Sequence, residues 1–557
     1  MTKPEGVGYW IRVFSCGVLW AAVQAEGEGT NAIVVNPMSP ASVTGKDDLR
    51  QLQHLASGVG WEFEPNADTA AALKKIGIRT LRCINVDPLP GQFDEKGHFS
   101  VGQPDRLLAH FNTCREVGAN PHIVIATGLH PDLLLTANDV KDRPSLMGMV
   151  PSGIYGPKDW TKFQSYCAAY FEYVLVAEHF TNAEFEVANE PDIGGSFSPV
   201  PPKPGNGSQA PYEAYFNLYR NVALAAQAFE RDHPGLRVRL GGPAIAWAFT
   251  FKYGDFNWTE RFLRDCGAGK VKLDFIGVHF YGNISSLDGA YPSNYPSFAE
   301  MLKKTLGWRD QYTPGVPLCL TEWGASYHTS NAPQSVVNGS SIGAAWAAAF
   351  LNAMLEGGVD AALYLTTTDL RQPVEGRPGT FGNVWGWPSL FVNPSVFGGA
   401  YPKAPCHVFD MVSRLAGARV EATRGERSLG CFASADRGAR RLTLLVWNSG
   451  ARIPEFGPPV ETAPGESVDL RVREAGAFFG VRSVRVRRWQ VSEGVSDASA
   501  QFTRGEPLDG AHTALKERDG GVFGIAEGQI DLRFAAPPSS VSLLEVTPES
   551  RTETGAQ

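Results

Sequence analysis

The sequence predicts a (β/α)8 barrel followed by an antiparallel β-sandwich, and three observations support this fold class. Between residues 50 and 416, short apolar runs rich in β-branched residues alternate with longer helical segments, which is typical of a parallel sheet with crossover helices. Between residues 417 and 548, short alternating runs are separated by turn-rich segments, which is typical of a sandwich. The chain has 557 residues, which is too long for one ordinary domain.

In the first region, several strands are clear and one is weak. The clear strands are Arg79–Val86, His122–Thr127, Phe185–Asn189, Val238–Gly242, Phe275–Tyr281, Pro317–Glu322 and Ala362–Thr367. The weak strand lies near His54–Trp61. The helical segments between them include Asp68–Ile76, Pro104–Val117, Lys158–Ala177, Tyr212–Asp232, Trp258–Cys266 and Ser341–Glu356. Together they make eight βα units, the number that closes a barrel of this type.

The second region begins after a last helical stretch, Pro405–Leu415. Its clearest strands are Arg441–Asn448, Ser467–Val472, Val481–Trp489, Ile530–Phe534 and Val541–Val546. Residues 26–49 form an N-terminal segment in which Ala32–Val35 could add a strand to the sandwich. The polar residues 549–557 predict a disordered tail.

Residues 1–25 resemble a secretory signal peptide. Lys3 and Arg12 precede an apolar run from Val13 to Val23, which is followed by small and polar residues. The run is too short to span a bilayer. We therefore expect a secreted or periplasmic protein, with an ordinary N-terminal extension as the alternative.

The composition excludes several classes of protein. Apolar residues make up 43% of the chain and charged residues 19%, which allows a large core and argues against disorder. The net charge of −8 offers no general attraction to nucleic acid or an anionic membrane. The eight cysteines show neither a CxxC pair nor metal-like spacing, so no zinc site or disulfide framework is indicated. Motifs of serine hydrolases, nucleotide-binding proteins and zinc proteases are missing.

Two glutamates carry the functional prediction. Glu190 follows the fourth strand in the run FEVANEPD, and Glu322 ends the seventh strand in PLCLTEWG. Parallel strands of a barrel end at the same rim, where such folds place their chemistry. Retaining glycosidases need two carboxyl groups roughly 5–5.5 Å apart, and these two residues could meet at that distance. For a lone glutamate at a strand end, a salt bridge at the rim is the simpler alternative.

Other polar residues near the same rim could assist. Asn189 could hold a substrate hydroxyl. Tyr281 could donate a hydrogen bond to Glu322 and His279 could bind a sugar hydroxyl, unless both simply fill the barrel. Arg82 could hold the charge of a carboxylate, or pair with a structural acid. Weaker candidates are the aromatic residues that could stack on sugar rings and the residues that could contact hydroxyl groups: Trp323, Tyr327, Trp385, Trp387, His130 and Asn85.

From these motifs the chain resembles glycoside hydrolase family 39, over about residues 50 to 450. The resemblance includes GIRTLRCIN, ATGLHPDLL, FEVANEPD, FIGVHFYG, LCLTEWGASY and YLTTTD, and it extends into the sandwich strand LTLLVWN. It implies that Glu190 is the general acid/base, that Glu322 is the nucleophile, and that His279 and Tyr281 line the subsite of the cleaved sugar. Members include β-xylosidases, α-L-iduronidases and enzymes acting on bacterial exopolysaccharides. The chain departs from the xylosidase pattern at Ala188 and Trp323.

The predicted function is therefore a retaining glycoside hydrolase that cleaves an oligo- or polysaccharide by double displacement. This chemistry requires neither a metal nor an organic cofactor. Two alternatives remain open at this stage, a transglycosylase that uses the same residues and a non-catalytic carbohydrate-binding protein on a decayed barrel. We expect no nucleic-acid or membrane partner, and the sequence does not indicate an oligomeric state.

Overall fold

A computed structural model of the chain describes residues 32–44, 47–60, 67–84, 89–126, 133, 157–192, 209–246, 257–283, 286–287, 289, 296–327, 334–369, 386–423, 428–454, 460–461, 464–504 and 506–549. Structural statements below refer to these residues. The signal peptide expected over residues 1–25 lies outside them, as do Asn85, His130 and Trp385. Of the predicted tail, the described part ends at Glu549.

Within the described residues, eight parallel strands close into a barrel, which confirms the first half of the predicted fold class. Around the barrel, the strands follow one another in chain order from β2 to β11. They are β2 (Gly58–Gly60), β3 (Thr80–Cys83), β6 (Asn120–Ile125), β7 (Glu184–Val187), β8 (Arg239–Ile245), β9 (Phe275–Tyr281), β10 (Leu318–Gly324) and β11 (Ala361–Tyr364). Their C-terminal ends therefore share one rim.

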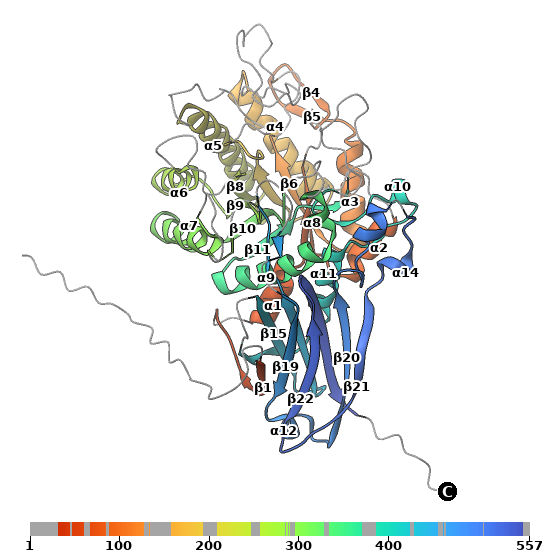
Figure 1. Ribbon diagram of the computed structural model, residues 1–557. Helices are drawn as coiled ribbons and strands as arrows, with labels where there is room; N and C mark the ends of the chain where they lie inside the picture. Colours follow the sequence, from red (N-terminus) through yellow and green to blue (C-terminus); the bar gives the residue numbers. More distant parts are fainter. Residues whose placement is uncertain are drawn as a thin grey trace, which may run out of the picture.

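Helices cover the outside of this barrel (Figure 1). They are α2 (Ala67–Lys75), α3 (Asp105–Val117), α4 (Trp160–Glu172) with its π-helical extension η2 (Tyr173–Ala177), α5 (Gln209–Asp232), α6 (Trp258–Gly269), α7 (Phe298–Tyr312), α9 (Ser341–Gly357) and α11 (Ala404–Arg414). Helices α3 and α9 end where Gly118 and Gly358 adopt the left-handed conformation that favours glycine. The sequence prediction does not include α7, whose interior holds the helix-weakening Gly307.

The weak strand expected near His54–Trp61 is the short β2, because helix α1 (Asp48–Leu55) occupies the first part of that range. Its glycines allow a close approach of the neighbouring backbone. A Cβ atom on Gly58 would lie 2.4 Å from the carbonyl oxygen of Ala362, and one on Gly60 would lie 2.3 Å from that of Leu365. The close packing that requires glycine here also removes the β-branched residues by which a strand is recognised.

In the described part of the C-terminal region, nine strands form one sheet in the order β21-β20-β23-β16-β15-β14-β1-β19-β22. Their bounds are β1 (Ala32–Pro40), β14 (Ala418–Ala422), β15 (Leu429–Asp436), β16 (Arg441–Asn448), β19 (Glu466–Val472), β20 (Ser483–Val491), β21 (Lys516–Gly524), β22 (Ile530–Ala536) and β23 (Ser540–Pro548). The N-terminal strand β1 pairs antiparallel with β14 and parallel with β19. The other pairs in this sheet are antiparallel.

The two arms of this sheet enclose one apolar core, which makes the domain a sandwich. Leu444 of β16 and Leu544 of β23 share that core with Leu470 of β19. Alternate residues of the same strands face the other way, and Leu445 and Leu543 join the core of the barrel domain. The period of two along each strand thus builds the sandwich core on one face and the domain junction on the other. Figure 1 shows the sandwich below the barrel, with α1 and α9 between them.

Short elements complete the described chain. They are β4 (Gly91–Phe93), β5 (Phe99–Val101), β12 (Thr366–Thr368), β13 (Ser389–Phe391), β17 (Ala451–Arg452), β18 (Val460–Glu461), α8 (Gln334–Gly339), α10 (Pro394–Phe397), α12 (Ala475–Phe479), α13 (Ser499–Thr503) and α14 (Gly510–Thr513).

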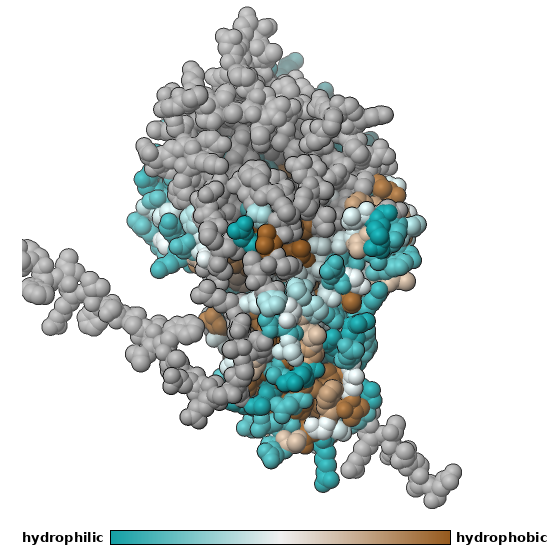
Figure 2. Space-filling model, in the orientation of Figure 1, coloured by the Kyte–Doolittle hydropathy of each residue, from teal (hydrophilic) through white to brown (hydrophobic). Residues whose placement is uncertain are grey.

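The surface of the sandwich and the burial of the cysteines are typical of a packed globular protein. Figure 2 shows hydrophilic and hydrophobic side chains interspersed over the visible face of the sandwich. Among helices in the described ranges, none combines the length and the hydropathy needed to cross a bilayer. The cysteines that the structure describes are all buried, and none of them forms a disulfide bond with another described residue.

Candidate active site

An extra residue in strand β10 decides which of its side chains face the barrel interior. The pairing of β10 with β9 shifts at Thr321, so that Glu322 lies opposite His279 and Trp323 lies opposite Phe280. Irregularities of this kind re-aim the side chains that follow them. Phe280 belongs to the core between barrel and helices. Glu322 therefore faces the interior beside His279, and Trp323 faces outward.

The position of Trp323 corrects one sequence-based expectation. Its side chain is fully buried and its ring packs near those of Trp346, Phe350 and Phe409, which come from the covering helices. It cannot stack on a sugar at the rim, because the shift at Thr321 turns it to the outer face. Glu322, the residue before it, takes the interior position instead.

Strand β7 ends in a kink that aims Glu190. Ala188 and Glu190 both have positive φ, 62° and 50°, a conformation that residues other than glycine rarely adopt. The backbone N–H of Glu190 donates to the carbonyl oxygen of Ala244 at 2.8 Å, where strand β8 has its own positive φ and register shift. The Glu190 side chain is 21% exposed. Such strained backbone is typical of functional sites.

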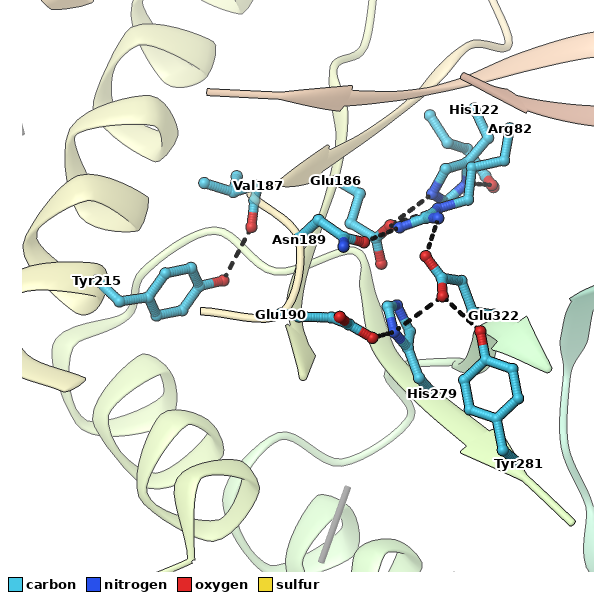
Figure 3. Close-up of polar contacts among 11 residues, drawn as sticks. Arg82, His122, Glu186, Val187, Asn189, Glu190, Tyr215, His279, Tyr281 and Glu322 are labelled. Atoms are coloured by element: carbon cyan, nitrogen blue, oxygen red, sulfur yellow. Dashed lines mark hydrogen bonds and ion pairs between the residues drawn. The ribbon is translucent and has the colours of Figure 1, made fainter. Parts of the chain in front are cut away.

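The two predicted glutamates come together at the C-terminal end of the barrel. One carboxylate oxygen of Glu190, one of Glu322 and one ring nitrogen of His279 all lie within 4.8 Å of one another. Nδ1 of His279 is 3.0 Å from Oε1 of Glu190 and 3.4 Å from Oε2 of Glu322. In Figure 3 the two carboxylates approach the imidazole from different sides. These three atoms could also hold a metal ion, but the cationic Arg82 beside Glu322 disfavours a second cation.

Glu322 is held by two donors. NH1 of Arg82 donates to its Oε1 at 2.7 Å, and the hydroxyl of Tyr281 donates to its Oε2 at 2.7 Å, as the sequence predicted for the tyrosine. Burial, followed by the charges of Glu322 and Glu190, raises the pKa of Tyr281 well above its usual value. The tyrosine therefore stays protonated and remains a donor. Both contacts orient the carboxylate of Glu322, and the guanidinium of Arg82 offsets its charge.

His279 faces the carboxylates rather than open solvent. Its side chain is fully buried. Burial alone would lower its pKa, but the charges of Glu322 and Glu190 outweigh that effect and raise it. An imidazolium between two carboxylates is consistent with this balance. The structure thus gives His279 a charge-balancing position, and the contact with a sugar hydroxyl that the sequence suggested stays a prediction.

Arg82 connects Glu322 to Asn189 near the rim and to Glu186, which lies deeper in the barrel. Its NH2 donates to Oδ1 of Asn189 at 2.8 Å, and its Nε donates to Oε2 of Glu186 at 2.9 Å. Nε2 of His122 lies 3.4 Å from that same oxygen of Glu186. Both alternatives for Arg82 are therefore correct, because it binds the rim carboxylate and a structural acid together.

Sequence reasoning missed Glu186 and His122. The available signal was the run Glu184-Phe185-Glu186-Val187, in which charged and apolar residues alternate. Strands of a parallel barrel are usually continuous apolar runs, so charges at a period of two mark interior positions.

Of the remaining candidates, the structure describes Tyr327 and Trp387, which lie beside Tyr281. Tyr327 is half-buried and its ring centroid is 6.2 Å from that of Tyr281, in a small cluster with Leu365 and Trp387. Close to Trp387, Asp369 and Lys403 form a fully buried ion pair at 3.0 Å, and Nζ of Lys403 also donates to the carbonyl oxygen of Trp387 at 2.8 Å. Asn85, His130 and Trp385 lie outside the residues that the structure describes.

Comparison with protein families decides the class. The sequence model of the family described as "Glycosyl hydrolases family 39" matches residues 158–508, well over half of the chain. The chain belongs to glycosyl hydrolase family 39. This confirms the resemblance drawn from the motifs, and it makes the protein a glycosidase. A non-catalytic carbohydrate-binding protein therefore loses its support.

Solved structures share the fold of this family 39 chain. The GH39 enzyme from Xanthomonas axonopodis pv. citri matches with a TM-score of 0.66 and 19% identity, covering 93% of this chain and 97% of the other. A monomeric β-xylosidase from Caulobacter crescentus CB15 matches with a TM-score of 0.65 and 20% identity, covering 93% and 100%. A bacterial orthologue of human α-L-iduronidase matches with a TM-score of 0.59 and 14% identity, covering 94% and 84%. Among curated proteins, no sequence matches this chain.

Proposed function

We propose that this glycosidase is a retaining enzyme that cleaves O-glycosidic bonds of an oligo- or polysaccharide by double displacement. The observation that supports the proposal is the approach of Glu190 and Glu322, with an oxygen of each within 4.8 Å of the other. Retaining enzymes hold their carboxyl groups roughly 5–5.5 Å apart, whereas inverting enzymes leave roughly 6.5–9.5 Å for a water molecule.

In the first step, Glu322 attacks the anomeric carbon and forms a covalent glycosyl-enzyme. Its buried position between Arg82 and Tyr281 supports this role, because the two donors orient the carboxylate toward the site and the guanidinium offsets its charge. The bond between the anomeric carbon and the leaving oxygen breaks, and its electrons leave with that oxygen.

Glu190 supplies the proton to that oxygen, and its partial exposure supports this role. In the second step it removes a proton from water, whose oxygen displaces Glu322 from the anomeric carbon with net retention. Nδ1 of His279, next to both carboxylates, offsets their mutual repulsion while the proton is on neither.

The substrate is proposed from chemistry and from the relatives. The amide of Asn189 is oriented by Arg82 through its oxygen, so its nitrogen is the atom that can donate to a sugar hydroxyl. A β-xyloside is the natural first substrate, because one of the solved structures that share the fold is named as a β-xylosidase. From residues 1–25 we also propose that the protein is secreted or periplasmic.

Replacing the two glutamates tests the mechanism against a panel of aryl glycosides that begins with nitrophenyl β-xyloside. We expect Glu322→Ala to reduce kcat by at least about 10⁴-fold, since the covalent step is lost. We expect Glu190→Ala to retain turnover of glycosides with good leaving groups when azide is added, and to yield a glycosyl azide of retained configuration.

Circular dichroism and thermal unfolding of both variants serve as controls for folding. Full activity of a folded Glu322→Ala variant, or an azide product of inverted configuration, would contradict the assignment. Product analysis with added acceptor sugar separates hydrolysis from transglycosylation by the same residues.

A further inference from the structure

A column of charged side chains runs down the inside of the barrel from Glu322. Arg82 contacts Glu322 at 2.7 Å and Glu186 at 2.8 Å, and Glu186 in turn contacts Nε2 of His122 at 3.4 Å. Nδ1 of His122 lies 3.1 Å from Glu184, whose other oxygen lies 2.8 Å from Arg239. Figure 3 shows the part of this column from Glu322 to His122.

This column departs from the usual interior of a parallel barrel, which is filled by bulky apolar residues. Glu186 and His122 are almost completely inaccessible to solvent. Removing such charges from water is unfavourable, and well-packed apolar residues often serve stability equally well. A buried charged chain that ends on the proposed nucleophile therefore indicates a role beyond packing.

We infer that Glu186 and His122 are positioning residues that set how strongly Arg82 holds the negative charge of Glu322. The inference rests on the proposed function, in which Glu322 must be ionised to attack. Glu186 and His122 touch neither the rim nor the reacting atoms, and they act through the guanidinium of Arg82.

The geometry divides the guanidinium between two carboxylates. NH1 of Arg82 points to Glu322, whereas Nε and NH2 point to Oε2 of Glu186. Oε1 of Glu186 has no hydrogen-bond partner among the described residues. The charge of Glu186 is therefore balanced on one side only, by Arg82 and by His122. The positive charge of His122 offsets the negative potential that Glu186 produces at Glu322. The net potential at Glu322, to which Arg82 contributes most, is then more positive.

Several charged and titratable groups face Glu322, Glu186 and His122. Glu322 faces Arg82 from β3, His279 and Tyr281 from β9, and Glu190 from the end of β7. Burial alone would raise the pKa of Glu186, but Arg82, His122 and His279 together lower it. Burial alone would lower the pKa of His122, but Glu184 and Glu186 raise it. Glu186 is thus an anion and His122 favours its cationic form.

Two substitutions are expected to move the acidic limb of the kcat/KM profile in opposite directions. That limb reports ionisation of the group that must be charged in the free enzyme. Glu186→Gln removes the negative charge that competes with Glu322 for the guanidinium of Arg82. The midpoint of the limb should therefore fall by about 0.5–1 pH unit. His122→Gln removes a positive charge from the column, so the midpoint should rise by about 0.3–0.5 pH unit.

Glu178→Gln is the matched control. Glu178 also pairs with an arginine, Arg115, at 2.6 Å, but it lies outside the barrel interior, so its loss should leave the midpoint unchanged. Each variant is assayed on the aryl glycoside that the wild type hydrolyses fastest, after its folding is checked by circular dichroism. If Glu186→Gln does not fold, His122→Gln decides the matter alone. A midpoint that stays unchanged or falls in His122→Gln overturns the inference.

Covalent labelling separates this test from a failure of the proposed mechanism. A 2-deoxy-2-fluoro aryl glycoside is incubated with the wild type, and the labelled residue is identified by peptide mass spectrometry. Label on a residue other than Glu322 refutes the proposed function itself. If Glu322 is labelled but the acidic limbs of both variants stay at the wild-type pH, only the role inferred for Glu186 and His122 is refuted. Shifts of the same sign in both variants refute that role as well.

Discussion

A single missing Cβ atom makes room for the buried carboxylate of Glu186. A Cβ on Gly277 of β9 would lie 2.3 Å from Oε1 of Glu186 and 3.3 Å from the hydroxyl of Thr321. Contacts under 3.0 Å cannot persist, and Glu186 is fully buried with little space to move. At the scale of one residue, this glycine therefore permits the charged column to exist.

Gly277→Ala should consequently displace Glu186 and, through it, Arg82. We expect a loss of about 1–3 kcal/mol in the free energy of unfolding, together with a reduced kcat. Gly307→Ala is the matched control, since a Cβ there meets nothing within 4 Å on an exposed turn of α7. That control should stabilise the protein by about 0.5–1 kcal/mol. Urea unfolding and turnover of the same aryl glycoside measure both effects, and equal behaviour of the two variants would contradict the expectation.

At the scale of the element, helix α9 takes its cap from a residue far away in sequence. The N-cap residue Ser340 makes no side-chain cap. Instead Oδ2 of Asp497, which comes from the segment between β20 and β21, accepts from the N–H of Ser341 at 2.8 Å. Its other oxygen accepts from the N–H of Ser499 at 2.9 Å. The sandwich domain thus satisfies an orphan donor of a barrel helix.

Removing this cap should destabilise the protein measurably. We expect Asp497→Ala to lower the free energy of unfolding by about 1–2 kcal/mol, because the buried N–H of Ser341 loses its acceptor. Asp497→Asn retains one acceptor oxygen, so its free energy of unfolding should fall by less than that of the alanine variant. Thermal unfolding of the three proteins in parallel is the measurement. An alanine variant as stable as the wild type would show that the cap is dispensable.

At the scale of the whole molecule, barrel and sandwich are joined by packing and by polar contacts. Figure 1 shows α11 and α14 on the same side of the junction. Nε2–H of His407 on α11 donates to the carbonyl oxygen of Thr513 on α14 at 2.9 Å. Burial lowers the pKa of His407 to about 4, against a usual value of 6.5. His110, buried under the barrel wall, is lowered to about 4 by the same cause.

These two histidines make the folded state sensitive to acid. Because their folded pKa values lie below the unfolded ones, their contribution to stability is complete above about pH 6.5 and is lost as the pH falls toward 4. Each should contribute about 2–3 kcal/mol over that window. We expect Tm to fall between pH 6.5 and 4.5, and His407→Gln to flatten that decline.

The exposed His98 provides the control, because its side chain is outside the packed core, and His98→Gln should flatten the decline less than His407→Gln does. A wild-type Tm that is constant across this range, or a His407→Gln profile parallel to it, would speak against the buried neutral histidines.

The sequence by itself determined the architecture, and it predicted the two carboxylates that the structure brings together at one rim. Strand and helix periods are local properties, so alternating βα units predicted the barrel and short alternating runs predicted the sandwich. Glu190 and Glu322 followed from their places at the ends of apolar strands. The hydrogen bond from Tyr281 could be anticipated because it lies on the strand next to that of Glu322.

Only the tertiary structure decided which way individual side chains face and which hydrogen-bond partners they have in common. The extra residue Thr321 reverses the phase of β10, and its register depends on pairing with β9 rather than on local sequence. The division of Arg82 between Glu322 and Glu186 arises from strands far apart in the chain. Burial and charge at such a point are properties of the assembled barrel, because they sum over neighbours that a linear pattern does not bring together.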